Sequence, residues 1–243
     1  MNEKFVTIKS CTLFTKIMGE KNGNPTIIMD AGYGDHSKAW DPVIEELSTL
    51  SRVFTYDRAG LGKSERSTSP RTSREMVKEL KELLTEANIA PPYILVGHSF
   101  GGGNMRMYAT EYPDEVFGLV LVDSTPEDYR ERFLPAMPED FQEAYHKQFV
   151  REGNYGEFME SLQQLKDMRR RLDVPLIVLS AGKKAHYSAE SQALWNDMQR
   201  ELLELSSQGE LVIAENSAHY IQRDEPDVIV DSVRKLIDLQ GCG

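Results

Sequence analysis

The chain has 243 residues, of which 40% are hydrophobic, enough to build one sizeable α/β domain with a single insertion. Its 28 basic and 39 acidic residues leave a formal net charge of −11, which argues against nucleic acid or an anionic membrane surface as a partner. The N-terminus has no apolar stretch typical of a signal peptide, and no apolar run approaches membrane-spanning length. We therefore expect a cytoplasmic protein without membrane insertion.

Strands and helices alternate along the chain. Apolar–polar alternation predicts two strands over 5–9 and 12–18, which would form an antiparallel hairpin at a sheet edge. Short apolar runs predict further strands over 26–29, 52–56, 93–96, 116–122, 176–179 and 211–214, and helices are predicted over 40–50, 72–87, 104–111, 188–205 and 226–239. This order is typical of the α/β class with a mostly parallel, doubly wound sheet.

One interval breaks the alternation. Residues 124–173 contain no predicted strand, but a charged, helix-prone segment with seven aromatic residues. It is too long for a simple connection, so we interpret it as a helical cap inserted into a core formed by residues 1–123 and 174–243. The alternative is a pair of surface helices with no role in binding.

The two cysteines lie near opposite ends of the chain. Cys11 and Cys242 have no metal-ligand spacing, so we interpret them as free thiols in a reducing compartment. A disulfide between the termini is the alternative. No metal site is predicted.

The strongest motif is G-x-S-x-G at Gly97–Gly101, between the strand over 93–96 and a following helix. Strand, tight turn and helix in this order are what a nucleophile elbow requires, with Ser99 on the turn. Gly97 and Gly101 lack the Cβ atoms that would keep the helix from closing on the strand. An isolated pentapeptide can also be an ordinary glycine-rich turn, so partners for Ser99 have to be found elsewhere in the chain.

A serine hydroxyl needs a base, and the base needs a group that orients it. The chain has five histidines. His219 follows the last predicted strand on a short loop, from which it can reach across the sheet edge to Ser99. His98 adjoins the serine, but its side chain is expected to point away from it. We therefore predict that His219 is the base.

The acid is predicted to be Asp123, which directly follows the strand over 116–122 and so lies at the same sheet edge. Its carboxylate would accept a hydrogen bond from His219 Nδ1. Asp123 could instead cap the following helix, and Glu127 and Asp128 are alternatives nearby. The backbone N–H groups of Phe100 and Tyr33 are predicted to form the oxyanion hole.

The elbow, the glycine-containing loop at 30–35 and the late histidine together resemble the α/β-hydrolase superfamily over nearly the whole chain. The stretch from Asp57 to Ser64, D-R-A-G-L-G-K-S, is similar to a loop common in its single-domain, esterase-like members. The resemblance implies that Asp57 and Ser64 are structural. It also implies a cap inserted after the strand that ends at Asp123.

The chain departs from that family pattern at two places. Ala31-Gly32 stands where His-Gly is usual, which leaves backbone donation intact but questions the side-chain support of this loop. Members usually carry the acid after the strand over 176–179, whereas residues 180–186 contain no carboxylate. Some members place the acid one strand earlier, which matches Asp123.

These features predict a cofactor-independent serine hydrolase that cleaves a small carboxylic ester through an acyl-enzyme. Hydrolysis of lactones, amides or peptides, or of carbon–carbon bonds, would use the same residues. A small-molecule receptor with slow or no turnover is the alternative from another class. The oligomeric state is left open.

Overall fold

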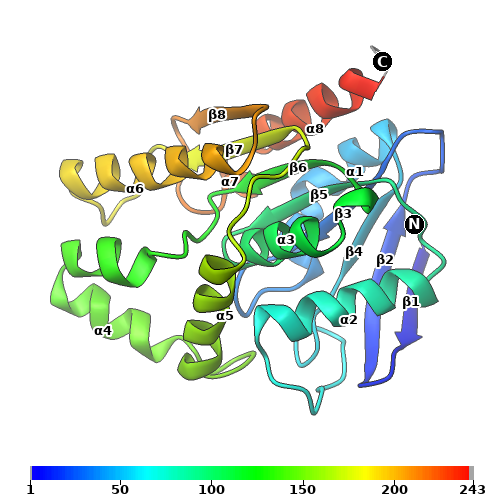
Figure 1. Cartoon of the computed structure of the whole chain (residues 1–243), viewed down its shortest axis with the longest axis horizontal. Coiled ribbons are helices and arrows are strands. Elements are labelled where there is room, and N and C mark those ends of the chain that lie inside the picture. The colour runs from blue at the N-terminus through cyan, green and yellow to red at the C-terminus, as the bar shows by residue number, and fades with distance from the viewer. Residues whose placement is uncertain (1, 241–243) are drawn as a thin grey trace.

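The structure is a computed structural model that describes residues 2–240 (Figure 1). Its described part contains eight strands: β1 (Asn2–Thr7), β2 (Thr12–Met18), β3 (Thr26–Asp30), β4 (Val53–Tyr56), β5 (Tyr93–His98), β6 (Val116–Val122), β7 (Leu176–Ala181) and β8 (Gly209–Ala214). Its α-helices are α1 (Asp41–Leu50), α2 (Ser73–Glu86), α3 (Phe100–Glu111), α4 (Glu139–Lys147), α5 (Tyr155–Asp167), α6 (Ala189–Glu201), α7 (Ile221–Asp224) and α8 (Pro226–Gln240).

The strands form one sheet in the order β1-β2-β4-β3-β5-β6-β7-β8. The pairs β1/β2 and β2/β4 are antiparallel, and the other pairs are parallel. The predicted α/β class, with a mostly parallel sheet, is therefore confirmed, and so is the antiparallel hairpin at the edge.

Both faces of the central strands are buried, as their near-continuous apolar sequences predict. In β5, Ile94 and Val96 face one hydrophobic cluster, whereas Tyr93 and Leu95 face the other. Helices α1 and α8 pack on the first face, and α2, α3 and α6 pack on the second (Figure 1). The sheet is therefore doubly wound.

Helix α3 begins four residues earlier than its predicted start at residue 104. The glycines at 101–103 have low helix propensity, but the sheet requires them here. A Cβ on Gly101 would lie 2.4 Å from the carbonyl oxygens of Asp30 and Ala31 at the end of β3. Close packing thus overrides propensity and brings the start of α3 against the sheet edge.

Residues 124–173, which we call the helical insertion, connect β6 to β7. They contain α4, α5 and two short helical turns at Tyr129–Phe133 and Leu134–Ala136. Asn154 and Glu157 form a reciprocal capping box that fixes the start of α5. Figure 1 shows α4 away from the sheet, with α5 between it and the core.

Among residues 2–240, no helix is both long and apolar enough to cross a bilayer. Cys11 is a buried free thiol. Cys242 lies outside the described residues, and with it the alternative of a terminal disulfide.

Candidate active site

The carboxyl ends of the parallel strands carry the residues that the sequence singles out. The strand register pairs Asp30 with Gly97 and His98 with Val122. On the other side it pairs Val122 with Leu179, and Ala181 with Ala214. The segments that follow these five strands therefore leave the sheet along one edge.

Ser99 occupies the turn between β5 and α3 with φ 53° and ψ −120°. A non-glycine residue rarely adopts a positive φ, and such a conformation costs about 1–3 kcal/mol. The end of β5 and the start of α3 pack closely around this turn and maintain its conformation. A Cβ on Gly97 would lie only 2.5 Å from Gly101 O. The Ser99 N–H donates to Val122 O at 3.0 Å, and Thr125 Oγ1 lies 3.4 Å from Ser99 Oγ. This is the strained elbow that the motif predicts.

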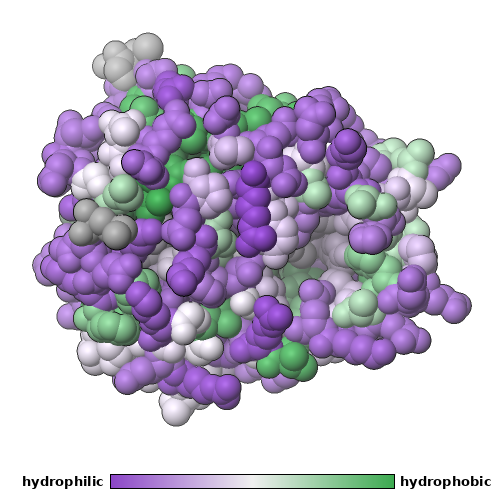
Figure 2. Space-filling model, turned by 180° about the vertical axis from the view of Figure 1, so that it is seen from behind, coloured by the Kyte–Doolittle hydropathy of each residue, from purple (hydrophilic) through white to green (hydrophobic). Residues whose placement is uncertain are grey.

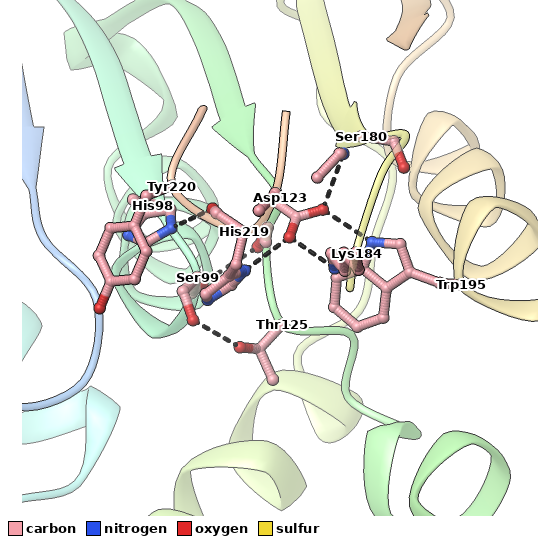
Figure 3. A network of polar contacts seen from close by, with 12 residues as sticks. His98, Ser99, Asp123, Thr125, Ser180, Lys184, Trp195, His219 and Tyr220 are labelled. Carbon is pink, nitrogen blue, oxygen red and sulfur yellow. Dashed lines mark hydrogen bonds and ion pairs between the residues drawn. The ribbon is translucent and has the colours of Figure 1, made fainter. Parts of the chain in front are cut away.

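His219 and Asp123 are hydrogen-bonded, with 2.6 Å between His219 Nδ1 and Asp123 Oδ2. His219 lies on the loop after β8, and Asp123 directly follows β6 with a positive φ of 44°. In Figure 3 the imidazole lies between the Asp123 carboxylate and Ser99. The structure thus brings together the three side chains predicted from the sequence, drawn from three different strand ends.

The Asp123 carboxylate is fully buried and has four donors. Its Oδ1 accepts hydrogen bonds from the Ala181 N–H at 3.0 Å and from Trp195 Nε1 at 2.7 Å. Its Oδ2 is shared by His219 and by Lys184 Nζ, which also lies 2.6 Å away. Burial by itself would raise the pKa of Asp123, but the Lys184 ammonium and the hydrogen bond from His219 hold it below its ordinary value. We call Asp123, Lys184 and His219 the Asp123 cluster.

His98, the last residue of β5, contacts the backbone of His219. Its Nε2 lies 2.9 Å from the His219 carbonyl oxygen, and since a carbonyl can only accept, Nε2 carries the proton. The two rings are 4.6 Å apart. Burial, together with the nearby His219, lowers the pKa of His98 to about 3, so His98 stays neutral. His98 does not line the cavity that Ser99 lines, and its ring contacts the His219 backbone instead.

The loop after β3 passes directly over the elbow. A Cβ on Gly32 would lie 3.1 Å from His98 Nδ1 and 3.4 Å from Ser99 Cβ, so only glycine fits there without displacing its neighbours. Tyr33, the next residue, lines the same cavity as Ser99 and Phe100. Phe100 begins α3, and the first N–H groups of a helix have no acceptor within it.

Arg58 supplies the side-chain support of this loop that the Ala31-Gly32 departure had left in question. Its guanidinium donates to the carbonyl oxygens of Ala31 and Gly32, both at 2.7 Å. It also forms ion pairs with Asp30 and, at the same distance of 2.5 Å, with Glu152 of the helical insertion. All three side chains are buried. We call Asp30, Arg58 and Glu152 the Arg58 cluster.

The helical insertion also contacts the loop directly. Glu152 Oε2 accepts a hydrogen bond from the Gly34 N–H at 3.2 Å, and the Gly153 N–H donates to the Tyr33 hydroxyl at 3.0 Å. The loop is thus held by Arg58 on one side and by residues 152–153 on the other.

A cavity of about 620 Å³ opens above Ser99. Figure 2 shows a hollow on the side of α4 and α6, less hydrophilic than much of the surrounding surface. Most of the cavity lining is aromatic, and no aspartate or glutamate within residues 2–240 takes part in it. The aromatic residues are Tyr33, Phe100, Tyr129, Phe141, Tyr145, Phe149, Phe158, Tyr187, Trp195 and Tyr220. Half of them come from the helical insertion, so this segment forms a wall of the cavity.

Sequence reasoning missed three residues beside the cavity. Arg58 lies in a motif whose glycines and aspartate drew attention instead, and Lys184 lies in the stretch noted only for its lack of a carboxylate. Glu152 gave no signal, since it is 94 positions from Arg58. Asp57 and Ser64 have the structural contacts that the resemblance implies: Asp57 accepts from the N–H groups of Ser37 and Lys63, and Ser64 Oγ donates to Asp57 O.

Among residues 2–240, no group of three or more His, Cys, Asp or Glu side chains is arranged to hold a metal ion. The polar groups of the site are Ser99, the two ion clusters and the backbone N–H groups around them.

The chain belongs to the α/β-hydrolase fold family, whose family model matches residues 25–191. The uncharacterized protein YqjL of Bacillus subtilis is 36% identical over 228 residues, which cover 93% of this chain and 88% of YqjL. The bovine (lyso)-N-acylphosphatidylethanolamine lipase is 37% identical over 101 residues, or 40% of this chain and 29% of the lipase. Mouse alpha/beta hydrolase domain-containing protein 10 has the same fold, with a TM-score of 0.72 at 17% identity over 99% of this chain and all of that one.

Proposed function

We propose that the protein is a serine hydrolase that cleaves carboxylic esters with an apolar acyl or alcohol group. The observation that carries the proposal is the 2.6 Å contact of His219 Nδ1 with Asp123, at a cavity that also exposes Ser99 on a strained elbow. The aromatic lining favours an apolar substrate group, because transfer of apolar surface from water is favourable. The bovine relative is named a lipase, which agrees with this substrate class.

In the proposed reaction, His219 Nε2 takes the proton of Ser99 Oγ while that oxygen bonds to the ester carbonyl carbon. The carbonyl oxygen becomes an oxyanion and accepts hydrogen bonds from the Tyr33 and Phe100 N–H groups. His219 then gives its proton to the leaving alkoxide oxygen, and the alcohol departs from the acyl-enzyme. Asp123 accepts from Nδ1 throughout and keeps Nε2 facing Ser99.

Water completes the cycle. His219 takes a proton from a water molecule as the water oxygen bonds to the acyl carbon, and returns it to Ser99 Oγ as the carboxylic acid leaves. The helical insertion is proposed to act as the cap over this reaction, because its aromatic side chains wall the cavity. Hydrolysis of lactones, amides or carbon–carbon bonds would begin with the same steps.

The test is turnover of short p-nitrophenyl esters together with labelling by a fluorophosphonate. We expect Ser99→Ala and His219→Ala to lower kcat by about 10⁴-fold or more. Replacement of His146, which lies on α4 and does not line the cavity, should leave turnover near wild type. Near-normal hydrolysis by either site variant would contradict the proposal. Labelling of Ser99 together with ester hydrolysis that stops after a single turnover would indicate a small-molecule receptor instead.

A further inference from the structure

Lys184 is a buried cation where the family usually carries its acid. It lies on the loop after β7, and its side chain is 7% exposed. The carboxylate expected on this loop is absent, since Asp123 provides it from the preceding strand. The loop after β7 thus supplies Lys184, the ion-pair partner of Asp123, where other family members usually have the acid itself.

The ammonium of Lys184 is held firmly at this position. It contacts Asp123 Oδ2 at 2.6 Å and lies 3.4 Å from the centre of the Trp195 ring and 4.9 Å from that of Tyr187. Trp195 in turn donates to the other Asp123 oxygen at 2.7 Å. Lys184 and Trp195 therefore fix both oxygens of the carboxylate that faces His219.

His219 and Lys184 share a single carboxylate oxygen. When His219 takes up a proton, two positive charges meet at Asp123 Oδ2, and each weakens the stabilisation of the other. Burial lowers the pKa of Lys184 to about 8, against the opposing effect of Asp123, so Lys184 remains charged below that pH. The charge of Lys184 therefore lies at the same carboxylate oxygen that an imidazolium at His219 would contact.

The other titratable groups around these side chains do not cancel this charge. His98 stays neutral, and burial raises the pKa of Tyr129 and Tyr187 above the ordinary value of a phenol. The Tyr220 hydroxyl donates to Asp35 at 3.0 Å, and His186 is an exposed residue at the cavity wall. Asp123 is the carboxylate that both cations contact.

We infer that Lys184 is a positioning residue that locks the Asp123 carboxylate onto His219 and whose charge competes with that of an imidazolium for the shared Asp123 oxygen. This inference rests on the proposed Ser99–His219–Asp123 function. It concerns how that arrangement is tuned, and so it can fail while the proposed function stands.

The experiment measures kcat/KM for a p-nitrophenyl ester from pH 4.5 to pH 9. Lys184→Met removes the charge but keeps an unbranched side chain that can cover Trp195, and Lys184→Arg keeps the charge. We expect the acidic limb of the Met variant to move to higher pH by about one unit or more, because Asp123 then stabilises the imidazolium alone. The limb of the Arg variant should stay closer to that of the wild type.

A Met variant whose acidic limb coincides with that of the wild type would overturn the inference and leave Lys184 a packing role. If the Met variant does not fold, Lys184→Gln carries the same test, since its amide can donate to Asp123 without a charge. Ser99→Ala is measured in parallel. Activity retained by Ser99→Ala would refute the proposed function, whereas an inactive Ser99→Ala with an unmoved limb in Lys184→Met refutes the inference about Lys184 alone.

Discussion

The two ion clusters beside Ser99 have opposite compositions. In the Arg58 cluster, one cation lies between two carboxylates, Asp30 and Glu152. In the Asp123 cluster, one carboxylate lies between Lys184 and an imidazole that can become a cation. The first cluster holds the loop over the elbow, and the second holds His219.

The difference follows from what each cluster has to do in the proposed reaction. Burial opposes the charge on Arg58, but Asp30 and Glu152 keep its pKa well above the usual value, so this cluster has a permanent cation. The Asp123 cluster has to accept a proton on His219 and release it in every cycle. The fixed charge of Arg58 suits a cluster that holds a loop in place. The Asp123 carboxylate, whose oxygen is shared by Lys184 and His219, suits a cluster whose total charge changes.

The largest effect should come from removing the carboxylate at the centre of the Asp123 cluster. We expect Asp123→Asn to lower kcat by about 10⁴-fold, because an amide neither stabilises the imidazolium nor fixes the same His219 tautomer. Steady-state hydrolysis of a p-nitrophenyl ester measures this. Asp128→Asn is the matched control, since Asp128 pairs with Lys166 on the surface. The reverse pattern, a large loss in Asp128→Asn with near-normal activity in Asp123→Asn, would move the acid into the helical insertion.

A smaller effect should come from the Arg58 cluster. We expect Glu152→Gln to lower kcat by about tenfold with little change in KM, because a less firmly held loop weakens hydrogen bonds that form fully only in the transition state. Glu157→Gln is its control, because Glu157 caps α5 and contacts the Arg71 N–H without touching the loop. Equal kcat for wild type and both variants would show that Glu152 serves stability alone.

A third cluster sharpens the comparison, because it has the composition of the Asp123 cluster without its proposed task. Glu127 is buried between Arg106, at 2.8 Å, and Arg169. Burial alone would raise the pKa of Glu127, but the two guanidinium groups hold it at about 2. Both of its cations are permanent and it does not line the cavity, so we expect Glu127→Gln to leave kcat near that of the wild type.

The third cluster should show itself in stability instead. A carboxyl group whose pKa is depressed in the folded state stabilises the fold above its unfolded pKa of about 4.5, and the stabilisation is lost as the pH falls toward 2. The free energy of unfolding of wild type and Glu127→Gln is measured by urea at pH 7 and at pH 3. The stability that the variant loses relative to wild type should be about 1–3 kcal/mol larger at pH 7 than at pH 3. A difference that does not change with pH would contradict this account.

The fold could be predicted because its signals are local. Apolar runs marked the central strands, and the glycines around Ser99 marked the elbow. Asp123 and His219 could be selected because residues at the ends of parallel strands meet at one sheet edge. Contacts between distant segments could not be predicted in this way. Nothing near Glu152 indicates that it reaches Arg58, and the sequence around Lys184 does not show that its ammonium lies on Trp195.

The position of Glu152 bears on how this scaffold could be re-engineered. Exchanging residues 124–173 for the corresponding stretch of another family member would be the obvious route to a new substrate preference, since that stretch walls the cavity. Such a chimaera would also remove one of the two acids that neutralise a guanidinium deep in the recipient. A transplanted lid therefore needs a carboxylate at the equivalent of position 152, or the graft will disturb the chemistry along with the selectivity.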